Sequence, residues 1–223
     1  MLRVAPTRWR ISHITALFLI TGVCGLIDAA CFLSLGGVFA EIMTGNLLFL
    51  CFSVGIGAPL AGSVKYLSAI AAFAVGASAG GRLAQGRRQR SRAGFLVEGA
   101  LLVAALATCA ALHPEAEGPA RDLVVSLLAV AMGMQNALVR RHGVPDLATN
   151  VMTLTLTALL ADSKLAGGGT TGNQPRRAGS IATFLLGATL GAVLTTRFGP
   201  CAPLALATAS YGLALTGLVV REA

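Results

Sequence analysis

The chain has 223 residues and a formal net charge of +8 at pH 7. Hydrophobic residues make up 55% of it and charged residues only 12%, and the mean hydropathy is +0.77. This composition is too apolar for a soluble domain of this length, so we exclude one and expect an all-α protein of the lipid bilayer. The excess of Lys and Arg then belongs to cytoplasmic loops, and no nucleic acid partner is expected.

The first predicted element is the apolar stretch 14–35, which follows a basic amino-terminal segment. It is too long for the core of a signal peptide and lacks a clear cleavage site, so we expect a retained span. Asp28 lies near its middle. A carboxyl there is costly unless it pairs, protonates or meets water, and such groups are functional by default. This favours a functional role for Asp28 over a purely structural one.

The second apolar stretch, 39–59, carries Glu41, Thr44 and Asn46 near its start. Thr and Asn side chains cap helix amino termini, whose free N–H groups form a partly positive site for an anion or for the negative end of a substrate. These residue types are also common at ordinary helix starts. The stretch either crosses the bilayer or enters and leaves on one side.

The predicted span 64–83 contains Gly76-Ala-Ser78-Ala-Gly80, a spacing that hydrolases also use around a nucleophilic serine. No strand is expected before Ser78, and the histidines of the chain lie at span ends, so we favour a small-residue packing face, with no enzyme activity and no catalytic residue. In the next span, 94–112, Glu98 is predicted to reach the cytoplasmic edge or to pair with a nearby Arg.

The predicted span 121–139 carries Gln135 and Asn136, and the apolar stretch 144–160 begins with Asp146-Leu-Ala-Thr149-Asn150. Asn136 alone favours an interhelical hydrogen bond. The acid followed by Thr and Asn repeats the pattern at the start of 39–59, which favours a binding role for both starts.

Two further spans, 178–196 and 201–220, complete the set. If six segments cross, only Lys65, Arg121 and Arg197 of the 17 Lys and Arg residues lie opposite the termini. If 39–59 and 144–160 also cross, the basic residues divide almost evenly. The positive-inside rule therefore favours six transmembrane helices plus two re-entrant or broken helices, with both termini cytoplasmic.

The chain is internally duplicated: Phe73-x-x-Gly76-Ala-Ser-x-Gly80 recurs at Phe184, and Gly25-x-x-Asp28-Ala recurs at Gly133. We expect one integral membrane domain, 1–223, with repeat one at 12–113 and repeat two at 120–221. Three spans and one re-entrant segment in each half make the two repeats inverted. The alternative is eight spans with parallel repeats.

The sequence shows no cofactor or metal motif, so neither is expected. Its five cysteines include no C-x-x-C pair, and we interpret them as small buried apolar residues, not as disulfides or metal ligands. They are Cys24, Cys31, Cys51, Cys109 and Cys201.

The segments GLIDAACFLSLGGVFAEIMTGNLLFL and AMGMQNALVRRHGVPDLATNVMTLTL resemble the YoaK-like family of uncharacterised bacterial multi-pass inner-membrane proteins. The resemblance covers nearly the whole chain. It implies a compact helical bundle in the bacterial plasma membrane, and it implies no particular substrate.

We therefore predict a transporter or facilitator for a small solute, in which Asp28 binds a proton or cation. The alternatives are a passive channel and a non-transporting membrane scaffold or regulatory protein. Glycine-rich faces permit a homo-oligomer. The expected substrate- or ion-binding residues are Asp28, Thr44, Asn46, Gln135, Asn136, Thr149 and Asn150.

Overall fold

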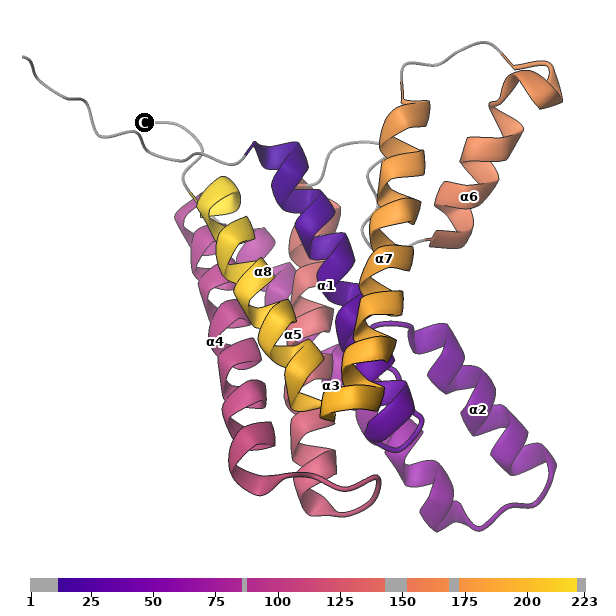
Figure 1. The fold of residues 1–223 in the computed structure, drawn as a ribbon, viewed down its shortest axis with the longest axis vertical. Coiled ribbons are helices and arrows are strands. Elements are labelled where there is room, and N and C mark those ends of the chain that lie inside the picture. The colour runs from indigo at the N-terminus through magenta and orange to yellow at the C-terminus, as the bar shows by residue number, and fades with distance from the viewer. Residues whose placement is uncertain (1–11, 86–87, 143–151, 169–172, 220–223) are drawn as a thin grey trace, which may run out of the picture.

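A computed structural model describes residues 12–85, 88–142, 152–168 and 173–219. Within these ranges all regular structure is helical, which confirms the all-α class (Figure 1). The elements are α1 (His13–Ser34), α2 (Met43–Gly55), α3 (Leu60–Ala84), α4 (Arg88–Leu112), α5 (Pro119–His142), α6 (Met152–Ala161), a 3₁₀ turn η1 (Lys164–Ala166), α7 (Gln174–Phe198) and α8 (Cys201–Val219).

Helix length separates six spans from two short helices. In the described part of the chain, six helices are long and apolar enough to cross a membrane, namely α1, α3, α4, α5, α7 and α8. At 1.5 Å per residue, α2 and α6 measure only about 20 Å and about 15 Å, against a hydrocarbon core of about 30 Å. The prediction of six spans and two short helices is confirmed in preference to eight spans.

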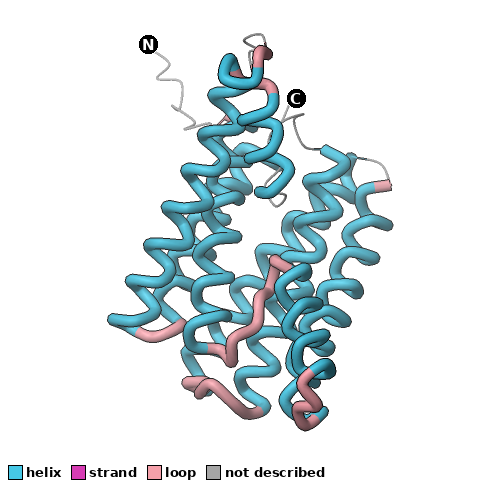
Figure 2. The backbone as a smooth tube through the Cα atoms, turned by 90° about the vertical axis from the view of Figure 1, so that its right-hand side faces the viewer, coloured by secondary structure: helices cyan, strands magenta, loops and turns pink. Residues whose placement is uncertain are grey.

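The short helices lie toward opposite ends of the bundle. In Figure 1, α2 stands beside the lower half of the molecule and α6 beside the upper half, and Figure 2 shows the same separation from the side. α2 packs on α3, and α6 packs on α7. The start of α1 and the end of α8 meet at the upper end, as an even number of spans requires.

Helices α1 and α5 form the centre of the bundle. Of the apolar window of each helix, 67% is buried in α1 and 61% in α5, against 22% to 39% in the other four spans. α1 packs mainly on α7 and α8, whereas α5 packs mainly on α3 and α4. The outer four helices expose their remaining apolar surface, which the bilayer covers.

Close helix contacts place the duplicated motifs against each other. A Cβ at Gly25 would lie 2.6 Å from the backbone oxygen of Phe184 and from the backbone nitrogen of Ala188. A Cβ at Gly133 would meet the backbone oxygen of Phe73 in the same way. The Gly-x-x-Asp/Asn-Ala motif of each half thus packs on the Phe-x-x-Gly-Ala motif of the other half. These contacts support the duplication, and the inverted relation of the halves stays a prediction.

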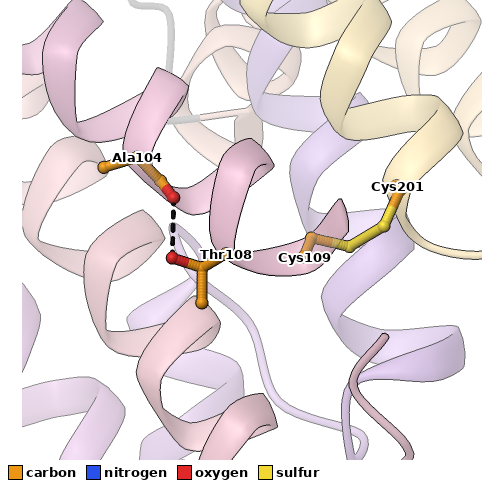
Figure 3. The surroundings of a disulfide bond; sticks show 4 residues. All are labelled: Ala104, Thr108, Cys109 and Cys201. Carbon is orange, nitrogen blue, oxygen red and sulfur yellow. Dashed lines mark hydrogen bonds between the residues drawn. A yellow bond between two sulfur atoms is a disulfide. The ribbon is translucent and has the colours of Figure 1, made fainter. Parts of the chain in front are cut away.

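A disulfide bond joins Cys109, near the end of α4, to Cys201, at the start of α8, with their Cα atoms 5.8 Å apart (Figure 3). The interpretation of all five cysteines as unpaired was therefore wrong. These two are 92 residues apart in sequence, and only the packing of α4 on α8 brings them together. Cys24 and Cys31 are free and buried as expected, whereas free Cys51 is exposed.

Candidate functional site

The loop between α1 and α2 turns back into the bundle. Gly36 and Gly37 adopt positive φ angles of 89° and 70°, a conformation that glycine reaches without steric cost. The Lys65 side chain donates a 2.6 Å hydrogen bond to the Gly36 carbonyl and fixes the turn. The backbone that follows runs back along α1 before α2 begins at Met43.

Asp28 binds this returning backbone. Its Oδ1 accepts hydrogen bonds from the N–H groups of Ala40 (2.8 Å) and Glu41 (2.9 Å), and its Oδ2 accepts one from Ile42 (3.2 Å). The carboxyl is only 3% exposed. Asp28 thus satisfies the backbone N–H groups of the three residues that precede α2, which would otherwise be buried without an acceptor.

Asn46 holds the same loop from the other side. Its Oδ1 accepts from the Phe39 N–H at 2.9 Å and its Nδ2 donates to the Phe39 carbonyl at 2.8 Å. The Phe39 ring stacks on Phe32 of α1 and on Phe49 of α2. Thr44, one of the predicted site residues, is exposed and lies outside this contact.

Glu41 connects the loop to α5. Its side chain is only 6% exposed, and its carboxyl interacts with the Asn136 amide and with the Cys24 thiol. Oε1 of Glu41 has no hydrogen-bond partner among the described residues. Asp28 and Asn136, the equivalent positions of the two halves, therefore meet through Glu41.

Gln135 extends the polar cluster into α5. Its Nε2 donates to the Cys24 sulfur at 3.0 Å, while its Oε1 is buried without a partner in the described structure. Asn136 donates to the Met132 carbonyl of its own helix at 2.9 Å. The amide is thus partly used within α5 and not in the interhelical hydrogen bond that the sequence favoured, and it also faces Glu41.

The structure brings together four of the predicted site residues: Asp28, Asn46, Gln135 and Asn136. Thr149 and Asn150, together with Asp146, lie outside the described residues.

Glu98 is a buried carboxyl that was not among the predicted site residues. The helix that carries it begins at Arg88, so Glu98 lies well inside the span and its side chain is 0% exposed. The prediction that Glu98 reaches the cytoplasmic edge is therefore wrong. The expected start of the span at residue 94 left out the polar first turns of α4, and this placed Glu98 too close to the end of the helix.

The described part of the bundle core contains three buried carboxyls: Asp28 and Glu41 in the polar cluster, and Glu98 apart from it. None of the ion pairs found among the described residues includes Asp28, Glu41 or Glu98; those present join Arg121 to Asp122 and Arg177 to Asp162. Asp28 is instead satisfied by backbone N–H groups, whereas Glu41 and Glu98 keep buried oxygens without partners. Burying an unpaired carboxylate is costly, so such a group favours protonation or a bound cation.

A bundle of six long apolar helices around a buried polar cluster defines a multi-pass α-helical membrane protein. The sequence profile of DUF1275, described as a protein of unknown function, matches residues 16–219. The chain belongs to this family.

The chain is also similar to the UPF0700 transmembrane protein YoaK of Bacillus subtilis (strain 168), with 28% identity over 152 residues. The match covers 66% of each protein, so the chain spans just under two thirds of that relative. No solved structure matches the chain. The predicted resemblance to a YoaK-like membrane family is confirmed.

Proposed function

We propose that the protein is a transporter or facilitator for a small solute, with its site where the returning loop meets α1 and α5. The observation that carries the proposal is the pair of buried carboxyls, Asp28 and Glu41, at the start of a helix too short to span the bilayer. Irregular backbone at membrane depth is tolerated where protein or a water-filled cavity covers it, and transporters place such breaks at their binding sites.

In this proposal, the carboxyl pair Asp28 and Glu41 couples solute transport to the binding of a proton or cation. Asp28 accepts three backbone N–H bonds and so holds the loop in place. Glu41, which lies beside it and retains an unpartnered oxygen, offers the open position for a proton or cation. Gln135 and Asn136 on α5 supply neutral polar groups for the solute.

The orientation that fits this function places both ends of the chain in the cytoplasm of a bacterial cell. Described basic residues at the ends of α3, α4, α5 and α7 gather at the same end of the bundle as the start of α1. They are Arg82, Arg90, Arg92, Arg140, Arg141, Arg176 and Arg177. The Cys109–Cys201 disulfide lies at the opposite end, where an oxidising compartment would preserve it.

The test uses the full chain reconstituted in liposomes that contain a pH-sensitive dye. The external probes are glycine, gluconate, choline, glucose and KCl, which represent zwitterionic, anionic, cationic, neutral and inorganic solutes and do not readily cross a bilayer unaided. We expect at least one probe to change the internal pH in wild-type vesicles. Glu41→Gln should abolish this change and retain membrane insertion, and the exposed-loop variant Glu115→Gln should behave as wild type.

Two other outcomes would reject the coupled transporter. Solute flux that does not saturate and moves no protons would indicate a passive channel. The scaffold interpretation is favoured by the complete hydrogen bonding of Asp28 and Asn46. It predicts no flux of any probe, together with a loss of thermal stability in Asp28→Asn.

A further inference from the structure

Glu98 lies in a second buried position that the proposed transport site does not use. Both of its carboxyl oxygens are buried without a regular hydrogen bond to any described residue, and the side chain is 0% exposed. The carboxyl interacts with the Tyr211 hydroxyl of α8. The Tyr211 ring also lies against Gly99, where a Cβ would come within 3.2 Å of it.

The Tyr211 hydroxyl already donates its one hydrogen to a backbone carbonyl. It points to the Phe95 carbonyl of α4, with an oxygen-to-oxygen distance of 2.9 Å. A carbonyl can only accept, so Tyr211 must be the donor in this bond. Toward Glu98 the same hydroxyl then has only an oxygen lone pair to offer. In this arrangement the two side chains can hydrogen-bond only if Glu98 carries a proton and donates it.

We propose that Glu98 is a proton-binding site in the bundle core, and that its protonation decides whether Tyr211 donates to the Phe95 carbonyl or to Glu98. With Glu98 neutral, the acid hydrogen points to the Tyr211 oxygen and Tyr211 keeps its bond to Phe95. With Glu98 ionised, the carboxylate is the stronger acceptor and draws the Tyr211 hydrogen away from the carbonyl.

The exchange involves one proton and no other covalent change. Uptake forms one O–H bond on Glu98 at the expense of a hydronium ion, which becomes water. Release reverses this step. Throughout, the Tyr211 O–H bond stays intact and only its direction changes. The Phe95 carbonyl lies within α4 and keeps its place in the helix in both states.

Few charged or titratable groups face Glu98. α8 contributes Tyr211, and α1 contributes Cys24, which lies within electrostatic range of Glu98 and also contacts Glu41. Described charged residues of the helices packed on α4, and of α4 itself, lie near helix ends and not around the carboxyl. They are Lys65 and Arg82 of α3, Arg90 and Arg92 of α4, and Arg121, Asp122, Arg140 and Arg141 of α5.

The experiment is an infrared pH titration of the full chain in phosphatidylcholine and phosphatidylglycerol vesicles, with no solute added. A protonated carboxylic acid absorbs at a C=O stretching frequency separate from that of a carboxylate. We expect a protonated-acid band that loses one component in Glu98→Gln, because Glu41 is a second buried carboxyl with an unpartnered oxygen. Tyr211→Phe should retain the band and shift it to higher frequency, because the acid loses its acceptor. The control Glu115→Gln changes an exposed loop carboxyl and should leave the band unchanged.

An acid band that is the same in Glu98→Gln as in wild type, or that does not move in Tyr211→Phe, overturns the proposal. Glutamine resembles the neutral acid, so Glu98→Gln should fold and should be more resistant to heat than wild type at alkaline pH. If it does not fold, the Tyr211→Phe shift, measured with ¹³C-labelled glutamate, decides alone. The titration needs no transported solute, so its failure is distinct from failure of the transport proposal.

Discussion

At the scale of single residues, Asp28 provides hydrogen-bond acceptors for backbone N–H groups that the returning loop buries. The N–H groups of Ala40, Glu41 and Ile42 lie against α1 and precede the first turn of α2, where no helical carbonyl can accept from them. Each such group costs about 1–3 kcal/mol when it is buried without a partner. One carboxylate satisfies all three, so Asp28 stabilises the position of the loop whether or not the protein transports a solute.

Replacing Asp28 with alanine should therefore destabilise the protein strongly. We expect a loss of about 3 kcal/mol or more in the free energy of unfolding, because three buried N–H groups lose their acceptor. Thermal denaturation in detergent, followed by circular dichroism, measures the effect.

Glu115→Ala is the control, because its side chain is exposed in the loop between α4 and α5. Surface substitutions usually change stability by no more than about 0.5 kcal/mol. Equal losses in the two variants would show that Asp28 does not hold the loop.

At the scale of helices, small residues set how closely the spans approach. A Cβ at Gly76 would collide with the Val130 backbone carbonyl, and one at Gly187 would collide with that of Gly22. In both cases the obstacle is backbone and cannot rotate away. Lipid provides no hydrophobic drive for helix association, so this close packing supplies much of the stabilisation between spans.

Gly76→Ala should separate α3 from α5 and lower the denaturation temperature. Gly81→Ala, in the same helix, is the control, since a Cβ there meets nothing within 4 Å. Alanine is the better helix former by about 0.5–1 kcal/mol, so Gly81→Ala should leave the denaturation temperature unchanged or raise it. A stable Gly76→Ala variant would contradict the packing argument.

Some of these features could be predicted from the sequence because they are local. The lengths of the apolar runs located all six spans to within a few residues, with the largest differences at the first turns of α3, α4 and α7. Repetition singled out Asp28 and Asn136 before any contact was known. The hydrogen bonds of Asp28 to Ala40 depend on a chain reversal at Gly36, and the Cys109–Cys201 bond depends on the packing of distant helices. Neither the hydrogen bonds of Asp28 nor the disulfide produces a local pattern in the sequence from which it could be predicted.

At the scale of the whole molecule, the arrangement of the spans predicts which loops share a side of the membrane. The loop after α2 and the loop between α4 and α5 lie at the lower end in Figure 1, whereas α4 begins at the upper end. The basic residues at the helix ends favour the upper end as the cytoplasmic side.

Single cysteines at Pro59, Arg90 and Gly168, placed in a chain without other free thiols, test this arrangement. A maleimide that cannot cross the membrane should label Pro59→Cys in intact cells. Arg90→Cys and Gly168→Cys should react only after the cells are opened. Labelling of Pro59 and Arg90 from the same side would reject the six-span topology.

The covalent link between Cys109 and Cys201 constrains how α4 and α8 can separate. Glu98 and Tyr211 each lie about 15 Å along their helices from the bonded cysteine, so the link sets the register that brings the acid and the phenol together. Because the bond holds one end of α4 against one end of α8, the two helices can separate mainly at their other ends. A rearrangement that pulls Tyr211 away from Glu98 while the disulfide stays intact is therefore expected to separate α4 and α8 most at the end that carries the chain termini.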